Sequence, residues 1–522
     1  MLWLLSALAV TSGAGRDQVC SGKGAPCDNA ELLRKANALQ AWAVENGATL
    51  DGIKLDVEGG HVVTRLTKAV TPGVPLMHLP YDMCMTADLL VAQAEAFDIG
   101  GGDAGGGTAE ELRKEKAGLV ANAKRLPPAV ALMAALLREA YAASTGGASR
   151  WAPYLAVLAP LPAAWEKDFE KVSPVPIFSG DNELALALLN GTSAFAPATA
   201  MVEEQHATWR DIVRPLTLSH RSFFDPDLFT LPRWQWAHGV ISSRSFGSVA
   251  SSGALRSTAG LSLVPILDSA DHLPDPHSRK EQPIISHGRR GGAQGRRVNA
   301  AFAQPQGELW YNDYGKLSGA QLLLLYGFVL DAADPQPDDR FDFRWEIVPR
   351  AKRHRTILLR HGLVRPTPAG SADPDGPLVA AFPLHREELD ARLVLFLRLH
   401  ALSKKEAALA KGKAQIGQGG TDTDAERRAL AGHPVSMRNE HRACRHLIFS
   451  VLQLIKEQMP VLEQEQWLRV GDSSAAAREQ LAQLSRTSLL ALHFRAAQRV
   501  LLEANIKLAE QMWKGLLRLA TV

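Results

Sequence analysis

The chain has 522 residues, of which 46% are hydrophobic, and its 58 Lys and Arg against 55 Asp and Glu give a formal charge of +3. This length can bury a large core and predicts a globular protein of roughly two to four domains. The charge is too balanced for the broad basic face that phosphate-backbone binding requires, which argues against a nucleic-acid partner. No apolar run approaches the roughly 20 residues that cross a bilayer, so we expect no transmembrane helix.

The first 28 residues form a segment of their own, MLWLLSALAVTSGAGRDQVCSGKGAPCD. A short apolar stretch followed by small residues is typical of a signal peptide, although this one lacks the positive n-region and also the arginine content of an organelle presequence. In an oxidising compartment Cys20 and Cys27 could close a small disulfide loop. The secretory pathway, an organelle and the cytoplasm all stay open as locations.

The next part of the chain predicts a helix and then short strands. The helix follows Asp28 and stops at Gly47, because capping residues flank apolar residues at helical spacing. Short apolar runs broken by glycine and proline, HVVTRLTKAVTPGVPLMHLP among them, predict short strands over residues 53–85. The low-complexity IGGGDAGGGTAEE predicts a surface loop, and helical patterns dominate residues 126–239.

Strand patterns return in LSLVPILDSADH and in GELWYNDYG. Between them, SHGRRGGAQGRR is interpreted as a solvated loop rather than an RNA-binding segment, because no aromatic residues are interleaved with its arginines. Alternating apolar residues over 341–347 predict a half-buried strand that closes this region. Helical periodicity then continues to the C-terminus and predicts a separate helical domain, interrupted by KGKAQIGQGGTDTDAE.

One cluster has the residue types of a zinc site, namely His433, His441, Cys444 and His446. The last three lie on the flank of an amphipathic helix at spacings that match no common zinc knuckle, so we predict no metal. A G-x-S-x-G elbow, a phosphate loop and a dinucleotide fingerprint are missing from any suitable strand-turn-helix context. The common hydrolase, kinase and Rossmann classes are therefore disfavoured.

Five stretches in a consistent order carry a family resemblance: EGGHVVTR, SRWAPYLAVLAPLP, WAHGVISSRSF, VPILDSADH and YNDYGKLSGAQLLLLYGF. Together they resemble the SET-domain methyltransferases, in the branch of the Rubisco large-subunit lysine methyltransferase and the actin-histidine methyltransferase. The resemblance implies an α+β fold, in which a SET-type sheet of short strands carries a helical insert at about 120–237 and an all-α C-terminal domain follows. It implies a SET domain over 29–345, after the N-terminal segment 1–28, and a helical substrate-binding domain over 346–522.

The resemblance implies an activity as well, which is methylation of a protein side-chain nitrogen with S-adenosylmethionine as the cofactor. Lysine is the expected target and histidine an alternative, in a monomer whose C-terminal domain binds the protein substrate. Two other classes of function stay open. One is a catalytically weak or inactive SET-like binding module, and the other is a helical scaffold in which the C-terminal domain carries the function.

The two Tyr-Gly steps make chemical sense in such an enzyme. A lysine must lose a proton before it attacks, and a narrow desolvated channel favours the neutral amine. A tyrosine gives the channel a cation-tolerant ring and a hydroxyl that orients the nitrogen, while the following glycine allows close backbone approach. By the resemblance, Tyr326 orients the target nitrogen and Tyr314 faces it across the channel.

The resemblance also assigns cofactor binding to residues from four stretches. The fixed donor fork of Arg244 suits the methionine carboxylate of the cofactor. The full set is Glu58, Gly59, Gly60, Arg244, Asp268, Asp271, His272, Gly327 and Phe328.

Three departures from the family pattern affect these positions. Asp271 stands where relatives have asparagine in D-x-x-N-H, and Gly319 replaces the asparagine of the Y-G-x-x-S-N turn. The usual R-G-L of the first turn is G-H-V here, with His61 in its middle. Asp271 can still accept from the cofactor ammonium but loses the amide donor, which keeps the binding-module alternative open.

Overall fold

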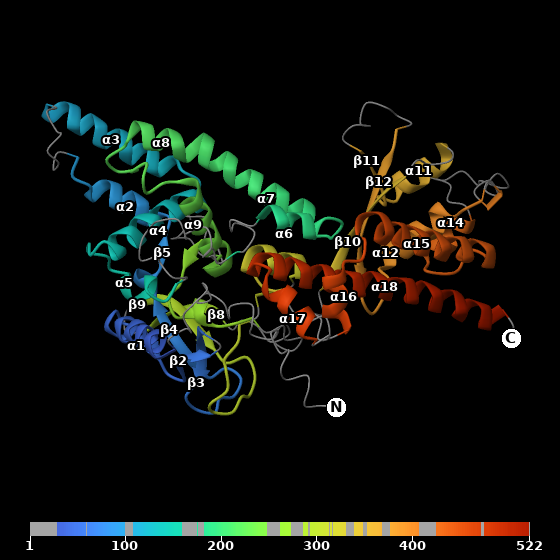
Figure 1. Cartoon of the computed structure of the whole chain (residues 1–522), viewed down its shortest axis with the longest axis horizontal. Helices are drawn as coiled ribbons and strands as arrows, with labels where there is room; N and C mark the ends of the chain where they lie inside the picture. The colour runs from blue at the N-terminus through green and yellow to red at the C-terminus, as the bar shows by residue number, and fades with distance from the viewer. Residues whose placement is uncertain are drawn as a thin grey trace.

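The computed structural model describes residues 29–58, 60–99, 108–158, 175, 182–247, 261–272, 285–290, 293–312, 314–315, 317–329, 339–347, 352–367, 376–403, 405–406, 424–470 and 474–520. The predictions for Cys20, Cys27 and Gly59, and for most of the two low-complexity stretches, concern residues outside these ranges. The molecule is elongated, with the short strands at one end and the C-terminal helices at the other (Figure 1). In the described part of the chain, no helix is long and apolar enough to span a membrane.

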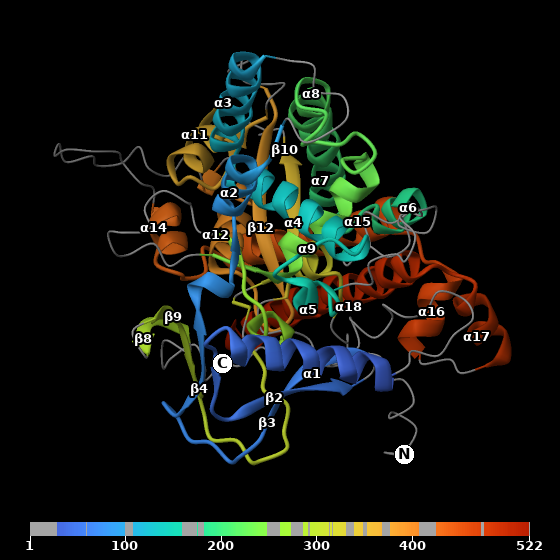
Figure 2. The same cartoon turned by 90° about the vertical axis from the view of Figure 1, so that its left-hand side faces the viewer.

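The N-terminal end consists of one helix on a set of short antiparallel strands, as predicted for residues 29–85. Helix α1 packs against β2 and β3, and Figure 2 shows it lying across them. Gly47, just beyond α1, has φ +86°, which suits a glycine that ends a helix. The elements are α1 (Asn29–Glu45), β1 (Thr49–Leu50), β2 (Ile53–Glu58), β3 (His61–Leu66), β4 (Pro75–Pro80) and β5 (Met85–Thr86).

Three small sheets hold these strands, in the orders β1-β4-β9-β8, β2-β3 and β5-β7-β6. The later strands are β6 (Ser245–Phe246), β7 (Ser262–Leu263), β8 (Ile285–Arg290) and β9 (Ala293–Asn299). The strand predicted at 307–315 is reduced to isolated bridges, Arg65 with Leu309 and His272 with Asn312. Segments far apart in the sequence therefore meet at this end of the molecule.

The arginine-rich stretch at 286–297 is a hairpin, so its interpretation as a loop was wrong. Strand β8 pairs with β9 along its whole length, and β9 also pairs with β4. The close approach of β9 to β4 needs a glycine at 295, because a Cβ there would lie 2.3 Å from the carbonyl oxygen of Leu79. Arg296 is buried and donates a 2.9 Å hydrogen bond to the Ser262 hydroxyl. The positive charge of the arginines predicted a solvent-exposed loop. The hydrogen bond to Ser262 and the pairing of β9 with β4 instead keep Arg296 buried.

Helices occupy most of the described residues in the predicted range 126–239 and two more, α2 and α3, precede it, around a tryptophan-rich core. Pro128 opens the largely buried α4, which packs against α9 with Trp234 and Trp236 in the core. Thr108 and Glu111 form a capping box at the start of α3. The elements are α2 (Asp88–Ala96), α3 (Ala109–Arg125), α4 (Pro128–Ser144), α5 (Ala152–Leu155), α6 (Asn182–Leu189), α7 (Phe195–Thr208), α8 (Arg214–Ser219) and α9 (Leu231–Arg244).

The C-terminal region is not all-α, which corrects the prediction for 346–522. Strand β12 pairs with β10 over eight residues each, from Arg340 opposite His385 to Ile347 opposite Leu378, and β11 adds a third strand. The predicted strand at 341–347 exists, but it belongs to this sheet and its core instead of closing the N-terminal region. Strand β12, LVAAFPLH, was missed because two alanines and a proline give it low strand propensity.

Helices cover this sheet and continue to the C-terminus. Helix α18 packs on α15 and α16 and also on α6, so it joins the helical insert to the C-terminal region. Figure 1 shows it running to the C-terminal end. The elements are β10 (Arg340–Ile347), α11 (Lys352–Arg360), β11 (Arg365–Pro366), β12 (Leu378–His385), α12 (Ala391–His400), α14 (Asp424–Leu430), α15 (Met437–Gln458), α16 (Glu463–Val470), α17 (Ala475–Ala482) and α18 (Arg486–Ala520).

Candidate active site

A strained turn places the central carboxylate of the site. Ile266 has φ +75°, a left-handed conformation that a β-branched residue rarely adopts and that costs on the order of 1–3 kcal/mol. Ile266 and Leu267 are fully buried, and their packing offsets this strain. The 3-10 turn Leu267–Ser269 follows and holds Asp268 at 4% exposure.

Asp268 binds two side chains from different helices. The Tyr154 hydroxyl donates to its Oδ2 at 2.8 Å, and Arg244 Nη1 donates to the same oxygen at 3.2 Å and to the Asp268 carbonyl at 3.2 Å. Burial, and then the charge of Asp268, raise the pKa of Tyr154 well above its ordinary value. Tyr154 therefore stays protonated as a donor that fixes the carboxylate.

Arg244 presents its remaining donors beside this pair. It is the last residue of α9, its side chain is 18% exposed, and only Nη1 is used on Asp268. Within the ranges that the structure describes, its Nε and Nη2 have no hydrogen-bond partner. An arginine fork held in this way can receive a carboxylate.

These side chains open onto a cavity of about 240 Å³. The cavity is lined by Ser243, Arg244, Ser245, Phe246, Gly247, Asp268, Ala270, Ile285, Asn312, Tyr314 and Tyr326. Four of the residues predicted for the site, Arg244, Asp268, Tyr314 and Tyr326, thus meet at one place. The other predicted residues that the structure describes are not part of its lining.

Three aromatic rings form a stack at one wall of the cavity. The Tyr314 ring lies 4.6 Å from the Tyr326 ring at 26° and 4.8 Å from the His272 ring at 27°, measured between centroids. Tyr314 donates through its N–H to His272 Nδ1 at 3.1 Å and through its hydroxyl to the Ala270 carbonyl at 2.9 Å. The tyrosine rings therefore contact each other, whereas the sequence had predicted them on opposite sides of an open channel.

Backbone geometry explains the glycine after each tyrosine. Gly315 has φ +103° and Gly327 has φ +77°, both in the left-handed region that glycine adopts without strain. Tyr326 ends the π-helical turn Leu322–Tyr326, and Gly327 reverses the chain there, with Phe328 6.3 Å from the Tyr326 ring. Both tyrosines reach the lining of the cavity at these turns.

Only a glycine fits at position 319 without displacing a neighbouring side chain. Ser318 and Gln321 form a capping box around the start of α10 (Gly319–Gln321). The Gly319 N–H donates to Asp339 Oδ1 at 3.0 Å, and a Cβ there would lie 2.8 Å from the same oxygen. Burial raises the pKa of Asp339. A side chain at 319 would displace this carboxylate.

The two other departures from the family pattern contact each other. His61 Nε2 lies 3.0 Å from Asp271 Oδ2, across 210 residues of sequence, and their side chains are 10% and 11% exposed. The Asp271 carbonyl accepts from the Asn312 N–H at 2.8 Å, next to the aromatic stack. Glu58 pairs instead with Arg65, at 2.6 Å. The turn at Gly60, φ +81°, is thus tied to the cavity through His61.

Sequence reasoning did not single out Tyr154, Phe246 or Asn312 as site residues. Tyr154 lies within SRWAPYLAVLAPLP, a stretch that supported the resemblance and could have identified it. Phe246 follows Arg244 by two residues and lines the same cavity. Asn312 carries no comparable sequence signal, because its position depends on a bridge to His272.

Comparisons with known proteins concern the fold and the C-terminal region. A family model described as Rubisco LSMT substrate-binding matches residues 349–502. The solved structure described as "Crystal structure of the SET domain of LSMT bound to Lysine and AdoHcy" aligns with a TM-score of 0.57 and 17% identity, covering 92% of this chain and 91% of that chain. The chain shares the fold of this SET-domain structure.

A second solved structure, "Structure of Rubisco LSMT bound to AdoMet", aligns with a TM-score of 0.55 and 17% identity, over 91% of this chain and 92% of that chain. A third, "Structure of Rubisco LSMT bound to Sinefungin and Monomethyllysine", aligns with a TM-score of 0.57 and 17% identity, over 91% of this chain and 92% of that chain. A search of curated protein sequences gave no match. The family model and these three structures all concern LSMT, and the actin-histidine side of the resemblance stays a prediction.

Proposed function

We propose that this protein is an S-adenosylmethionine-dependent protein methyltransferase that acts on a side-chain nitrogen, lysine in preference to histidine. The observation that carries the proposal is the cavity in which the Arg244–Asp268 pair lies beside the stacked Tyr314 and Tyr326. The shared fold adds support, because the similar structures are LSMT bound to AdoMet, AdoHcy or lysine.

The residues at the cavity fit the cofactor. The methionine end of S-adenosylmethionine carries a carboxylate and an ammonium, and when bound the cofactor supplies a methyl group on a positively charged sulfur. Arg244 would hold the carboxylate through Nε and Nη2, and Asp268, fixed by Tyr154, would hold the ammonium. Phe246 and the tyrosine rings supply apolar, cation-tolerant walls.

The tyrosines would prepare the target nitrogen. Their rings form a wall that favours the neutral amine over the ammonium, because desolvation disfavours charge. The Tyr314 hydroxyl already donates to the Ala270 carbonyl, so Tyr314 positions Tyr326 through the stack. We assign orientation of the nitrogen to the Tyr326 hydroxyl, which accepts an N–H of the amine and turns its lone pair toward the methyl group.

We further propose that residues 29–339 form the SET unit with its helical insert at about 120–237, and that the C-terminal unit binds the protein substrate. The boundary moves from 345 to 339 because β10 pairs with β12. The description of the family model that matches 349–502 supports the substrate-binding role.

Two measurements test the proposed function. S-adenosylhomocysteine at about one hundred times its Kd should stabilise the protein by about 2.7 kcal/mol, seen as a rise in Tm. Arg244→Gln should lose most of this stabilisation, whereas Gln at the exposed Arg221 should keep it. Absence of cofactor binding by the wild type would overturn the proposal.

The second measurement is incubation with labelled S-adenosylmethionine and a cell extract, followed by identification of the labelled residue. Label on lysine is the expected result. Label on histidine would select the histidine-directed alternative. Cofactor binding without label on any protein would select the binding-module alternative.

A further inference from the structure

The C-terminal region contains a second cavity, of about 180 Å³. It lies between α11, α15 and the chain that leaves α12, far along the sequence from the candidate active site. The lining residues are His354, His400, Ala401, Leu402, Ser403, Arg442 and His446. They include a guanidinium, which only donates, and three imidazoles, each of which can donate, and the described lining holds no carboxylate.

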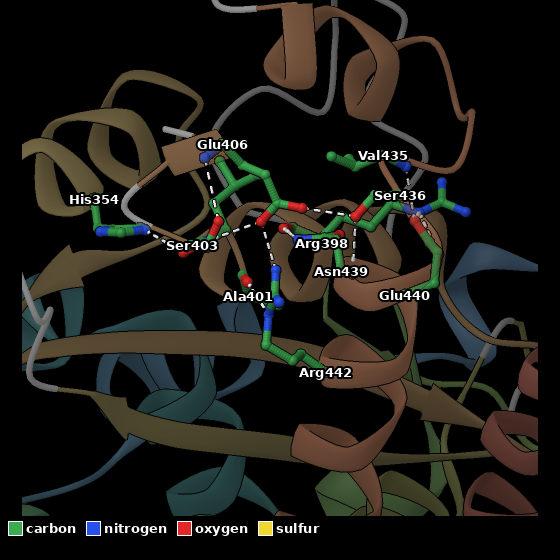
Figure 3. A network of polar contacts seen from close by, with 11 residues as sticks. His354, Arg398, Ala401, Ser403, Glu406, Val435, Ser436, Asn439, Glu440 and Arg442 are labelled. Carbon is green, nitrogen blue, oxygen red and sulfur yellow. Dashed lines mark hydrogen bonds and ion pairs between the residues drawn. The ribbon is translucent and has the colours of Figure 1, made fainter. Parts of the chain in front are cut away.

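Arg442 is held rigidly at this cavity (Figure 3). Its Nε donates to the Ala401 carbonyl at 2.8 Å, and its Nη2 donates to Glu406 Oε2 at 2.5 Å. Its Nη1 has no partner among the residues that the structure describes, and the side chain is 36% exposed. One edge of the guanidinium is therefore fixed while the other can still bind an oxygen.

Glu406 orients Arg442 and uses its oxygens away from the lining. It accepts from the Ser403 N–H at 2.8 Å and from the Ser436 hydroxyl at 2.6 Å. Burial opposes its ionisation, but the hydrogen bonds from both serines and the charge of Arg442 outweigh burial and lower its pKa to about 2. Its acceptors are thus committed, and it is not among the residues that line the cavity.

The imidazoles are also fixed in place. His400 stacks on Phe396 at 5.4 Å and 6°, and it lies edge-on to His446 at 5.2 Å. His354 donates from Nε2 to the Leu402 carbonyl at 2.8 Å, and it is only 8% exposed. In the described part of the chain the Nδ1 of His354 has no hydrogen-bond partner. Because Nε2 donates to a carbonyl, Nδ1 accepts in the neutral ring and donates only in the imidazolium form, the form that a bound carboxylate would favour.

The charges and donors select the ligand. A cationic group would face the Arg442 guanidinium, which argues against a methylammonium even though aromatic rings are close. Among the described residues, no three His, Cys, Asp or Glu side chains are grouped to hold a metal ion. An anionic oxygen ligand is left, and the volume admits a carboxylate with its methylene groups.

We propose that this cavity binds the carboxylate of a Glu or Asp side chain on the protein substrate, with Arg442 and the imidazoles as donors, His354 in its imidazolium form. The inference rests on the proposed function, which makes the ligand of the C-terminal unit a protein. It adds a substrate class: a protein with an acidic residue that docks apart from the methylated nitrogen.

Binding is tested on the full-length protein with carbon-13-labelled histidine. Imidazole signals are followed by NMR during titration with N-acetylglutamate N-methylamide, and separately with the neutral glutamine analogue. We expect saturable shifts of the His354, His400 and His446 signals with the glutamate probe only. Equal shifts with the glutamine probe, or none with the glutamate probe, would overturn the proposal. Tighter binding of an O-phosphoserine probe than of the glutamate probe would overturn the carboxylate assignment and identify the ligand as a phosphate group.

Variants sharpen the test. Arg442→Gln should weaken the glutamate probe roughly tenfold, the loss typical of a hydrogen bond to a charged group. Arg445→Gln, on the same helix but exposed, removes the same charge away from the cavity and should have no effect. If Arg442→Gln lowers Tm, Arg442→Lys replaces it, keeping the charge and losing the fork. Equal affinity of the Arg442 and Arg445 variants would contradict the assignment.

Methyl incorporation separates this inference from the proposed function. Arg442→Gln should raise the KM for the labelled protein roughly tenfold, with kcat and S-adenosylhomocysteine binding unchanged. An unchanged KM would overturn the docking role. Probe binding by a wild type that methylates nothing would support the carboxylate site and contradict the enzyme assignment instead.

Discussion

The cavity among the short strands and the cavity among the C-terminal helices are assembled in different ways. The first depends on backbone conformation, because Ile266, Gly315 and Gly327 all have positive φ where the chain turns toward it. The second lies between regular helices whose positions are set by side-chain pairs, such as Arg398 with Glu440 at 3.0 Å. Substitutions should therefore lower catalysis or cofactor binding at the first cavity, and should lower the free energy of unfolding among the helices around the second.

The largest effect is expected for Glu465→Ala. Glu465 pairs with Arg495 and Arg499, whose side chains are 3% and 1% exposed, and this triad ties α16 to α18. Removing the carboxylate leaves two buried positive charges and should cost about 3–5 kcal/mol of unfolding free energy. Denaturant titration measures this, with the exposed Glu463→Ala of the same helix as the matched control. A loss no larger than that of the control would show that the triad does not hold the helices.

At the first cavity, Tyr326→Phe should lower kcat by on the order of ten- to a thousandfold, about 1.4–4 kcal/mol of transition-state stabilisation. The ring and its stack on Tyr314 are kept, and only the hydroxyl is lost. Tyr314→Phe should be milder, because its hydroxyl is bound to the Ala270 carbonyl. Methyl incorporation and cofactor titration are measured for both variants. Wild-type kcat in Tyr326→Phe would remove Tyr326 from the mechanism.

The pair of His61 and Asp271 should act as one unit in cofactor binding. His61→Ala and Asp271→Asn should each weaken S-adenosylhomocysteine binding, and the double variant should lose less than the sum, with a coupling of about 1 kcal/mol. The coupling is expected because the 3.0 Å contact of His61 with Asp271 connects the turn at Gly60 to the strand bridge between His272 and Asn312. Calorimetric titration of the four proteins measures the cycle. Additive losses would show that the contact does not couple the two turns.

The smallest effect is a pH dependence near the second cavity. The pKa of Glu406 falls from its ordinary value of 4.5 to about 2 on folding, so its ionised form stabilises the native state. This contribution is fully present above pH 4.5 and is lost as the pH falls toward 2. The difference in unfolding free energy between wild type and Glu406→Gln should shrink over that range. If the difference in unfolding free energy between the two proteins stayed constant from about pH 6 to about pH 2, the assigned role of the ionised Glu406 would be contradicted.

The same contrast explains what the sequence could predict. Helical periodicity and capping are local, so α1, α4 and α15 followed from residues close to one another. The strand pattern at 341–347 was also visible, but its partner β12 lies 31 or more residues away along the chain and left no local signal. For the same reason the stretch 286–297, most of which lies in β8 and β9, was taken for a loop, since the ladder of β9 to β4 joins distant segments.

At the candidate site, the motifs led to Arg244, Asp268, Tyr314 and Tyr326, which line one cavity. Their catalytic and cofactor roles are proposals. The contacts between them could not be predicted, because the stack of the two rings depends on where the Ala270 carbonyl and His272 hold Tyr314. The contact of His61 with Asp271 was hidden as well, although both residues were noted as departures from the family pattern.

Strand β10 has a consequence for how the chain can be divided. In the sheet order β10-β12-β11, β12 is the central strand, and β11 covers only Leu378 and Val379. A polypeptide that started at residue 349, where the family match begins, would lack β10 and leave the backbone of Leu378–His385 as an open edge. An apolar edge of this length recruits other strands, so such a fragment should aggregate, whereas one that starts before Arg340 keeps its sheet closed on that side.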